Sequence, residues 1–177
     1  MNDDQQALRK FLASRNAELD SHEAVFNLIR SAAIVVTVME SAALRPLGLT
    51  HAGYRLLLEL WVKGPLEPHQ LAGFMMVTKP TIVGAVNTLV KAGLVRRLRS
   101  TSDRRRLTVA LTDAGLERIE KAGAAWREWQ QRVTSDLTLE EKRTMAALAE
   151  RIASTAARAR AAAAEASATS APGDPAG

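Results

Sequence analysis

The sequence predicts a mainly α-helical fold with one small β-hairpin. Apolar side chains recur at helical spacing over most of the 177 residues, which is typical of one-faced helices. Only the segment around residues 94–111 differs, because two short runs rich in leucine and valine flank a polar turn there. Apolar residues make up 47% of the chain and charged residues 24%, so a packed core is expected. The length suits one module with helical arms better than two full domains.

The N-terminal part predicts two helices. Residues 4–19 carry apolar side chains at the spacing of a short one-faced helix. A long helix is predicted from Asp20 to Leu44, where Arg45-Pro46 ends it. We expect a second subunit to cover this long helix, because it holds no charged side chain between Arg30 and Glu40.

The most apolar part of that helix, residues 31–39, is about half of the ~20 residues that span a bilayer. A buried helix is therefore predicted rather than a membrane anchor.

Three shorter helices follow in the middle of the chain. Thr50 is a predicted N-cap for a helix over residues 51–62, and Gly64-Pro65 ends it. A helix over residues 68–75 begins with a proline, which the first turn tolerates. Thr78 is the predicted N-cap of a helix that runs to Lys91. The last two helices are joined by only two residues, so they predict a helix-turn-helix.

The C-terminal part predicts a hairpin and two more helices. Residues 94–98 and 107–111 are the expected strands, and the helix after Thr112 is expected to reach about Val133. Thr138 and Glu141 form a capping box that opens the last helix. Beyond Arg160 the chain is rich in alanine, serine and proline, so we expect disorder there, although alanine can prolong a helix.

The net charge of +5 is concentrated in one segment. Residues 96–106 hold six arginines and one aspartate, so the rest of the chain sums to zero. Such a concentration is typical of a surface that meets phosphate or another polyanion. The alternative is a solvated loop that happens to be rich in arginine.

A helix-turn-helix followed by a hairpin with arginines at its tip is a winged helix. In this arrangement the second helix enters the major groove of DNA, while the wing follows the backbone and can place a guanidinium in the minor groove.

Several short motifs resemble the MarR family of bacterial transcriptional regulators. Their order and spacing carry the resemblance, which covers roughly residues 23–155. They are Leu47-Gly48-Leu49-Thr50, Thr78-Lys79-Pro80-Thr81, Lys91-Ala92-Gly93-Leu94-Val95, Ser102-Asp103-Arg104-Arg105 and Leu111-Thr112-Asp113-Ala114-Gly115.

The resemblance implies a winged helix-turn-helix with N- and C-terminal dimerisation helices. It implies a homodimer that grips a pseudo-palindromic operator in double-stranded DNA, most often a repressor that a small anionic or aromatic ligand releases. The expected parts are N-terminal dimerisation helices over 1–48, a DNA-binding lobe over 49–112, C-terminal dimerisation helices over 113–160 and a disordered tail over 161–177.

The wing supplies one set of expected DNA contacts. By the resemblance, Asp103 pairs with Arg105 and orients it for the minor groove, while the alternative for Asp103 is a plain turn aspartate. The expected wing residues are Arg96, Arg97, Arg99, Ser102, Asp103, Arg104, Arg105 and Arg106.

The recognition helix supplies the other set. Its apolar residues Ile82, Val86 and Leu89 are expected to face the core. Its outward side chains are short, so no arginine is available to contact guanine bidentately. Gly84 either lets the backbone approach DNA or is a tolerated surface glycine. The expected contact residues are Thr78, Lys79, Thr81, Val83, Gly84, Asn87, Thr88 and Lys91.

An effector site is expected around Arg30. Its guanidinium has apolar neighbours and would need a carboxylate partner, which a ligand held near His51 and Trp61 would supply. The alternative is a salt bridge across the dimer to a glutamate such as Glu23.

The sequence argues against an enzyme. It has no cysteine, and its three histidines are scattered without ligand spacing, so neither a metal nor a cofactor is expected. Trp126 and Trp129 are expected to pack at an interface. The polar N-terminus has no features of a signal peptide, so we expect a cytoplasmic protein. An alternative function is a winged-helix interaction module that binds acidic partners.

Overall fold

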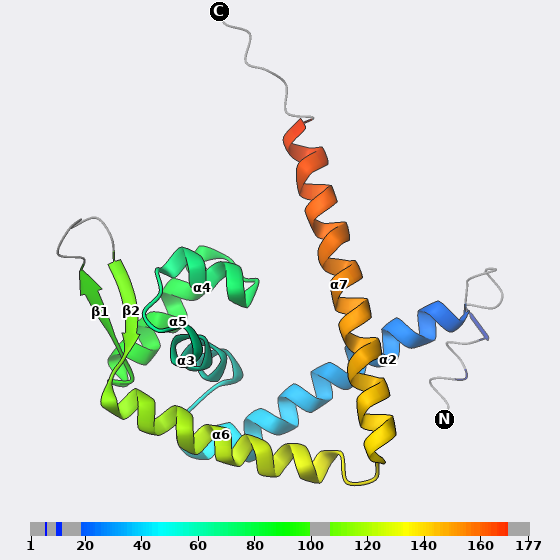
Figure 1. The fold of residues 1–177 in the computed structure, drawn as a ribbon, viewed down its shortest axis with the longest axis horizontal. Helices are drawn as coiled ribbons and strands as arrows, with labels where there is room; N and C mark the ends of the chain where they lie inside the picture. The colour runs from blue at the N-terminus through cyan, green and yellow to red at the C-terminus, as the bar shows by residue number, and fades with distance from the viewer. Residues whose placement is uncertain (1–5, 7–9, 12–18, 100–106, 170–177) are drawn as a thin grey trace, which may run out of the picture. The chain divides into compact units, whose positions relative to one another are not determined.

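The computed structural model describes residues 6, 10–11, 19–99 and 107–169, and Figure 1 shows its ribbon. The helix predicted over residues 4–19 lies mainly outside the described residues. The chain forms two compact units that divide after Trp129, and each is described by itself. The described residues are mostly helical, with one antiparallel hairpin, so the predicted fold class is confirmed.

The long first helix is α2, Leu19–Met39. It continues as a π-helical turn, Glu40–Leu44, and a 3-10 turn, Arg45–Leu47. Gly48 then reverses the chain with a left-handed backbone, φ 68°. The π-helical turn ends at Leu44, the residue where the sequence predicts the end of the helix. This turn is wider than a turn of α-helix.

Most of α2 is exposed in a single chain, so its predicted burial against a second subunit stays a prediction. Met39 is its only buried residue. The apolar stretch is also longer than residues 31–39: the helical segment Leu19–Leu47 is long and apolar enough to cross a membrane by length and composition alone. Only 6% of its most apolar window is buried. The large apolar side chains that α2 exposes are Val25, Phe26, Leu28, Ile29, Ile34 and Val38.

Three short helices form the lobe that follows. They are α3, His51–Lys63, α4, Pro68–Met75, and α5, Lys79–Lys91. Thr50 caps α3 as predicted, since its Oγ1 accepts a hydrogen bond from the amide of Gly53 at 3.1 Å. The axes of α4 and α5 differ by 110°, within the range of a helix-turn-helix.

The hairpin pairs β1, Val95–Arg99, with β2, Leu107–Leu111. The register places Val95 opposite Leu111 and Arg99 opposite Leu107. An isolated bridge adds Leu66, from the link between α3 and α4, to the free edge of Val109. The two hydrogen bonds of this bridge measure 3.0 and 2.7 Å, so the middle of β2 is tied to the link between α3 and α4.

The core of the lobe lies between these helices and the hairpin. Its fully buried side chains come from α3, α4, α5 and β2 and from the π-helical turn before the lobe. They include Leu44, Leu56, Leu57, Leu71, Ile82 and Val109. Periodicity predicted the inward face of α5 correctly, because Ile82, Val86 and Leu89 are all at most 4% exposed.

Two helices complete the described chain: α6, Asp113–Val133, and α7, Leu139–Thr169. Thr112 caps α6, and the capping box of Thr138 and Glu141 opens α7, both as predicted. The helix continues past Arg160 to Thr169, where disorder was expected, because alanine has the highest helix propensity.

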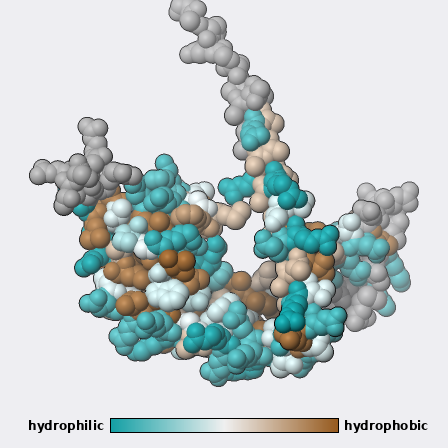
Figure 2. All heavy atoms as spheres, viewed as in Figure 1, coloured by the Kyte–Doolittle hydropathy of each residue, from teal (hydrophilic) through white to brown (hydrophobic). Residues whose placement is uncertain are grey.

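Four large apolar residues of α7 are exposed: Leu139, Met145, Leu148 and Ile152. In Figure 2 the distal part of α7 is mostly pale brown with isolated teal patches, the pattern of alanine interrupted by charged residues.

Candidate nucleic-acid interface

The outer face of α5 is a surface of short side chains. Thr81, Gly84, Asn87, Thr88 and Lys91 are all exposed, as expected. Val83 is 48% exposed, so its methyl groups are free to contact a thymine methyl. An ideal Cβ on Gly84 would meet no atom within 4 Å, so nothing in the described structure requires a glycine there.

Several hydroxyl groups on this face already bond within the protein. Thr78 occupies the N-cap position of α5, but its side chain makes no cap bond and lies 2.8 Å from the hydroxyl of Thr81 instead. Thr88 donates its hydroxyl to the carbonyl of Gly84 at 3.1 Å. The hydroxyl of Thr88 therefore offers DNA mainly an acceptor.

One polar contact joins the helix to the wing. The guanidinium of Arg97, on β1, donates a hydrogen bond from Nη2 to the Oδ1 of Asn87. Sequence reasoning assigned both residues to DNA binding but missed this contact, since the residues lie on different elements.

The basic side chains of α5 and β1 make the surface of these two elements positive. Residues 79–99 hold two lysines, three arginines and no acidic residue. All five basic residues are exposed. Lys79 and Lys91 stand at opposite ends of α5, and Arg96, Arg97 and Arg99 stand on β1. Such a surface is complementary to a phosphate backbone.

The expected contacts at the tip of the hairpin, Ser102, Asp103, Arg104, Arg105 and Arg106, lie outside the described residues. Their roles remain predictions.

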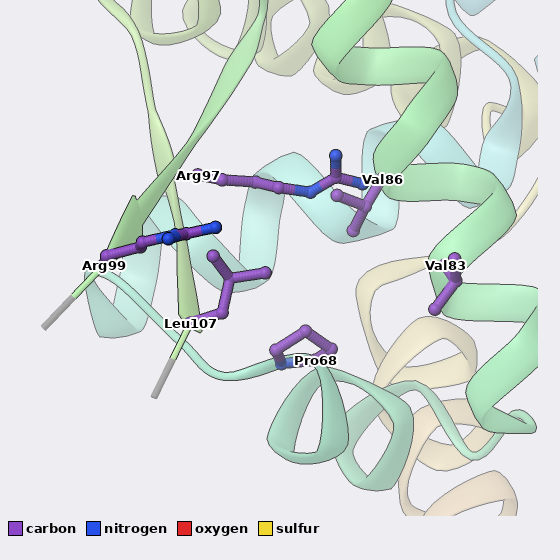
Figure 3. Close-up of a pocket in the computed structure, with 6 residues that line it drawn as sticks. All are labelled: Pro68, Val83, Val86, Arg97, Arg99 and Leu107. Carbon is purple, nitrogen blue, oxygen red and sulfur yellow. The ribbon is translucent and has the colours of Figure 1, made fainter. Parts of the chain in front are cut away.

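A pocket of about 400 Å³ lies between α5, the hairpin and the start of α4. In Figure 3, Arg97 extends from β1 toward α5 and ends beside Val86, while Arg99 lies above Leu107. The pocket wall is apolar elsewhere, so the two arginines are its charged groups. Its lining residues are Pro68, Val83, Val86, Arg97, Arg99 and Leu107.

A second pocket, of about 330 Å³, lies between α3 and α6. Tyr54, Trp61 and Trp126 contribute aromatic rings, and Arg127 and Glu120 contribute charges. Tyr54 and Trp126 are tilted against each other with centroids 6.0 Å apart. Burial raises the pKa of Tyr54 and the nearby Arg127 opposes this, so Tyr54 keeps its phenolic proton at neutral pH.

The structure brings only one of the three expected effector residues to this pocket. Trp61 lines it, whereas Arg30 and His51 do not. Arg30 is exposed on α2. The backbone amide of His51 donates to Oε2 of Glu40 at 2.8 Å, and burial, with help from Arg55, lowers the pKa of its imidazole against the opposing charge of Glu40.

Sequence reasoning missed most of the second pocket. Tyr54, Leu58 and Trp61 follow one another at i, i+4 and i+7 on α3, a signal that was available. Trp126 stacks on Trp129 at 5.4 Å within the chain. Among the described residues, no group of three or more His, Asp or Glu is placed to hold a metal ion.

Comparisons with known proteins agree with this geometry. The MarR family model matches residues 49–107, which span the lobe from its first helix to the second strand. A Bacillus subtilis protein, the uncharacterized HTH-type transcriptional regulator YwaE, is 26% identical over 144 residues, covering 81% of this chain and 84% of the relative.

Two solved structures extend the likeness to most of the chain. A probable transcriptional regulator from Pseudomonas aeruginosa is 31% identical, with a TM-score of 0.66 over 72% of this chain and 94% of that one. Bordetella bronchiseptica BpsR, in a study of how 6-hydroxynicotinic acid regulates its DNA binding, has a TM-score of 0.67 at 19% identity, over 74% and 98%. This chain therefore belongs to the MarR family and is a transcriptional regulator that binds DNA.

Proposed function

We propose that the protein is a homodimeric repressor that binds a pseudo-palindromic operator and is released by a small aromatic carboxylate. The observation that carries the DNA-binding mode is the positive surface of α5 and β1, with five exposed cations and no acidic residue over residues 79–99. In this mode α5 lies in the major groove, and the wing follows the backbone into the minor groove. The family resemblance adds Arg105, oriented by Asp103, as the minor-groove contact.

Salt dependence tests this mode of binding. Arg96→Ala removes one exposed cation from β1 and should flatten the slope of log affinity against log salt by about one unit. Lys121→Ala is the matched control, since it removes an exposed cation from α6 that pairs with Glu117 at 2.5 Å. Equal slopes for both variants would argue against the positive surface, and absence of DNA binding at low salt would favour an acidic protein partner.

The wing tip has its own test. Arg105→Ala should weaken operator binding by about 1–3 kcal/mol, and Asp103→Ala should act in the same direction by misorienting the guanidinium. If both variants bind as tightly as the parent at matched salt, the residue-by-residue likeness to the family does not extend to the wing.

The exposed apolar side chains of α2 support the proposed dimer. A helix with so many large apolar groups in water would be an unusually large hydrophobic patch for a soluble monomer. A second copy covers such a patch and places two lobes on two operator half-sites.

Sedimentation at micromolar concentration tests the dimer. Ile29 is 64% exposed, so Ile29→Glu should dissociate the dimer without disturbing the fold of the chain. Val62→Glu, at 62% exposure on α3, is the matched control and should remain dimeric. A folded parent monomer at that concentration would contradict the proposal.

The pocket between α3 and α6 supports the ligand response. Its three aromatic rings suit the ring of an aromatic acid, and Arg127 suits the carboxylate. The pocket lies between α6 and α3, and α3 is a helix of the DNA-binding lobe. A ligand in the pocket would contact both α3 and α6, the helix that supports the lobe.

We would test this site with 6-hydroxynicotinic acid as the probe, because BpsR is regulated by it. Binding should quench the fluorescence of Trp61 and Trp126 and release DNA, and Arg127→Ala should abolish both effects while DNA binding remains. Arg30→Ala serves as the comparison. If Arg30→Ala abolishes the response and Arg127→Ala does not, the effector site lies at α2.

A further inference from the structure

The contact between Arg97 and Asn87 determines what the recognition helix can read. A guanidinium carries only hydrogen-bond donors, so the atom of the Asn87 carboxamide that faces Arg97 must be its oxygen. The amide NH₂ of Asn87 then faces away from Arg97. Asn87 is exposed on the outer face of α5, so this NH₂ group is what it presents to a groove.

Asparagine usually reads adenine, because its oxygen accepts from the base N6 amino group while its NH₂ donates to N7. In this structure Arg97 already occupies one of the two lone pairs of that oxygen. Adenine would therefore share this oxygen with the Arg97 guanidinium. A carboxamide rotated to avoid the sharing would turn its NH₂ toward Arg97 and set donor against donor. The contact therefore opposes the adenine-reading orientation.

We propose that Arg97 is a specificity-determining residue that favours hydrogen-bond donation by Asn87 to a base. As a donor, Asn87 pairs with guanine through O6 or N7 and with thymine through O4. With adenine it keeps only the bond to N7, and cytosine offers it no acceptor in the major groove, so guanine and thymine are preferred at this position. This inference rests on the proposed placement of α5 in the major groove. It assigns Arg97 a role in orienting a neighbour in addition to its charge.

The position of Arg97 suits this role. Its side chain crosses from β1 to α5 along the wall of the 400 Å³ pocket and ends beside Val86, one residue before Asn87 (Figure 3). Side chains alternate along a strand, so the neighbouring Arg96 points to the other face of the hairpin. Arg96 therefore carries the same charge without reaching the recognition helix and is a matched control.

Selection of bound sequences from a randomised duplex pool tests the proposal. Asn87→Ala identifies the position that Asn87 reads, as the one whose preference it abolishes. The parent should prefer guanine or thymine there over adenine by about tenfold. Arg97→Met keeps the apolar stem in the pocket but removes the donors, so adenine should rise by about tenfold relative to guanine at that position only. Lysine, like arginine, carries hydrogen-bond donors and no acceptor, so Arg97→Lys should keep the parental preference.

Arg96→Met should lower affinity for all sequences and leave this preference unchanged. A parental preference for adenine at the Asn87 position would overturn the proposal, and so would an unchanged preference in Arg97→Met. An Arg96→Met variant that shifts the preference as much as Arg97→Met would also overturn it, since charge alone would then explain the effect. If Asn87→Ala changes no position, the placement of α5 in the groove fails, and the inference fails with it.

Discussion

An ideal Cβ on Gly115 would lie 1.9 Å from the carbonyl oxygen of Leu94. This close approach joins the start of α6 to the residue before β1. Thr112 reinforces it, because its hydroxyl donates to the carbonyl of Gly93 at 2.6 Å and accepts from the amide of Gly115 at 3.0 Å. The first turn of α6 is thus fixed against the end of the helix-turn-helix.

Gly115→Ala should destabilise the fold strongly. The added methyl group would overlap a backbone oxygen that cannot rotate away, so we expect a loss of about 3 kcal/mol or more in the free energy of unfolding, measured by urea titration. Gly73→Ala is the control, since nothing lies within 4 Å of its ideal Cβ. The control should gain up to about 1 kcal/mol. Similar stabilities for the two variants would mean that the close approach is not maintained in solution.

Glu40→Ala should also lower stability, by a smaller amount. The carboxylate accepts the His51 amide at the start of α3 and lies 3.7 Å from Arg45. Loss of this cap should cost about 1–2 kcal/mol in the free energy of unfolding. Glu59→Ala, which breaks only a pair with Lys63 on one helix, should cost about 0.5 kcal/mol or less. Equal losses would show that the Glu40 contact adds nothing beyond an ordinary surface pair.

The imidazole of His51 should make stability depend on pH. Because its pKa is lowered in the folded chain, the unfolded chain binds more protons between that pKa and the ordinary value of about 6.5. The contribution is fully present above about pH 6.5 and is lost as the pH falls through that window. His51→Gln should therefore lose less stability on acidification than the parent, as measured by urea titration at a series of pH values.

A second substitution gives the opposite change. Glu40→Gln removes the charge that raises the pKa of His51, so the loss of stability on acidification should grow. If Glu40→Gln instead abolishes the pH dependence, Glu40 rather than His51 is its source.

Gly84→Ala separates stability from DNA binding. The free protein leaves space for a methyl group there, so the variant should gain about 0.5–1 kcal/mol in the free energy of unfolding. Its affinity for operator DNA should fall, because the methyl group would stand between the helix backbone and the bases. Unchanged affinity would identify Gly84 as a tolerated surface glycine.

Local features of this fold could be predicted from the sequence, and long-range ones could not. The caps at Thr50, Thr112 and Thr138 involve residues three positions away, so the pattern of residue types contains them. The inward face of α5 follows from periodicity in the same way. The contact of Arg97 with Asn87, in contrast, depends on how the hairpin packs on the helix.

The same reasoning applies to the candidate sites. The exposed cations of α5 and β1 were predictable, because each residue type already indicates its place on a surface. The pocket between α3 and α6 was not, since Trp61 and Trp126 meet only after two distant helices pack. The π-helical turn at Glu40–Leu44 also depends on tertiary packing, which buries Ala43 and Leu44.

The bridge between Leu66 and Val109 sets a mechanical limit on DNA reading. It adds Leu66 as a one-residue third strand beside β2, and the contact of Arg97 with Asn87 joins β1 to α5, so the recognition helix and the hairpin move as one piece. In the proposed binding mode, the distance between a major-groove contact from α5 and a backbone contact from β1 is then constant. A change in operator half-site spacing cannot be absorbed inside the lobe and must be met at its connections, the turns at residues 40–48 and the start of α6.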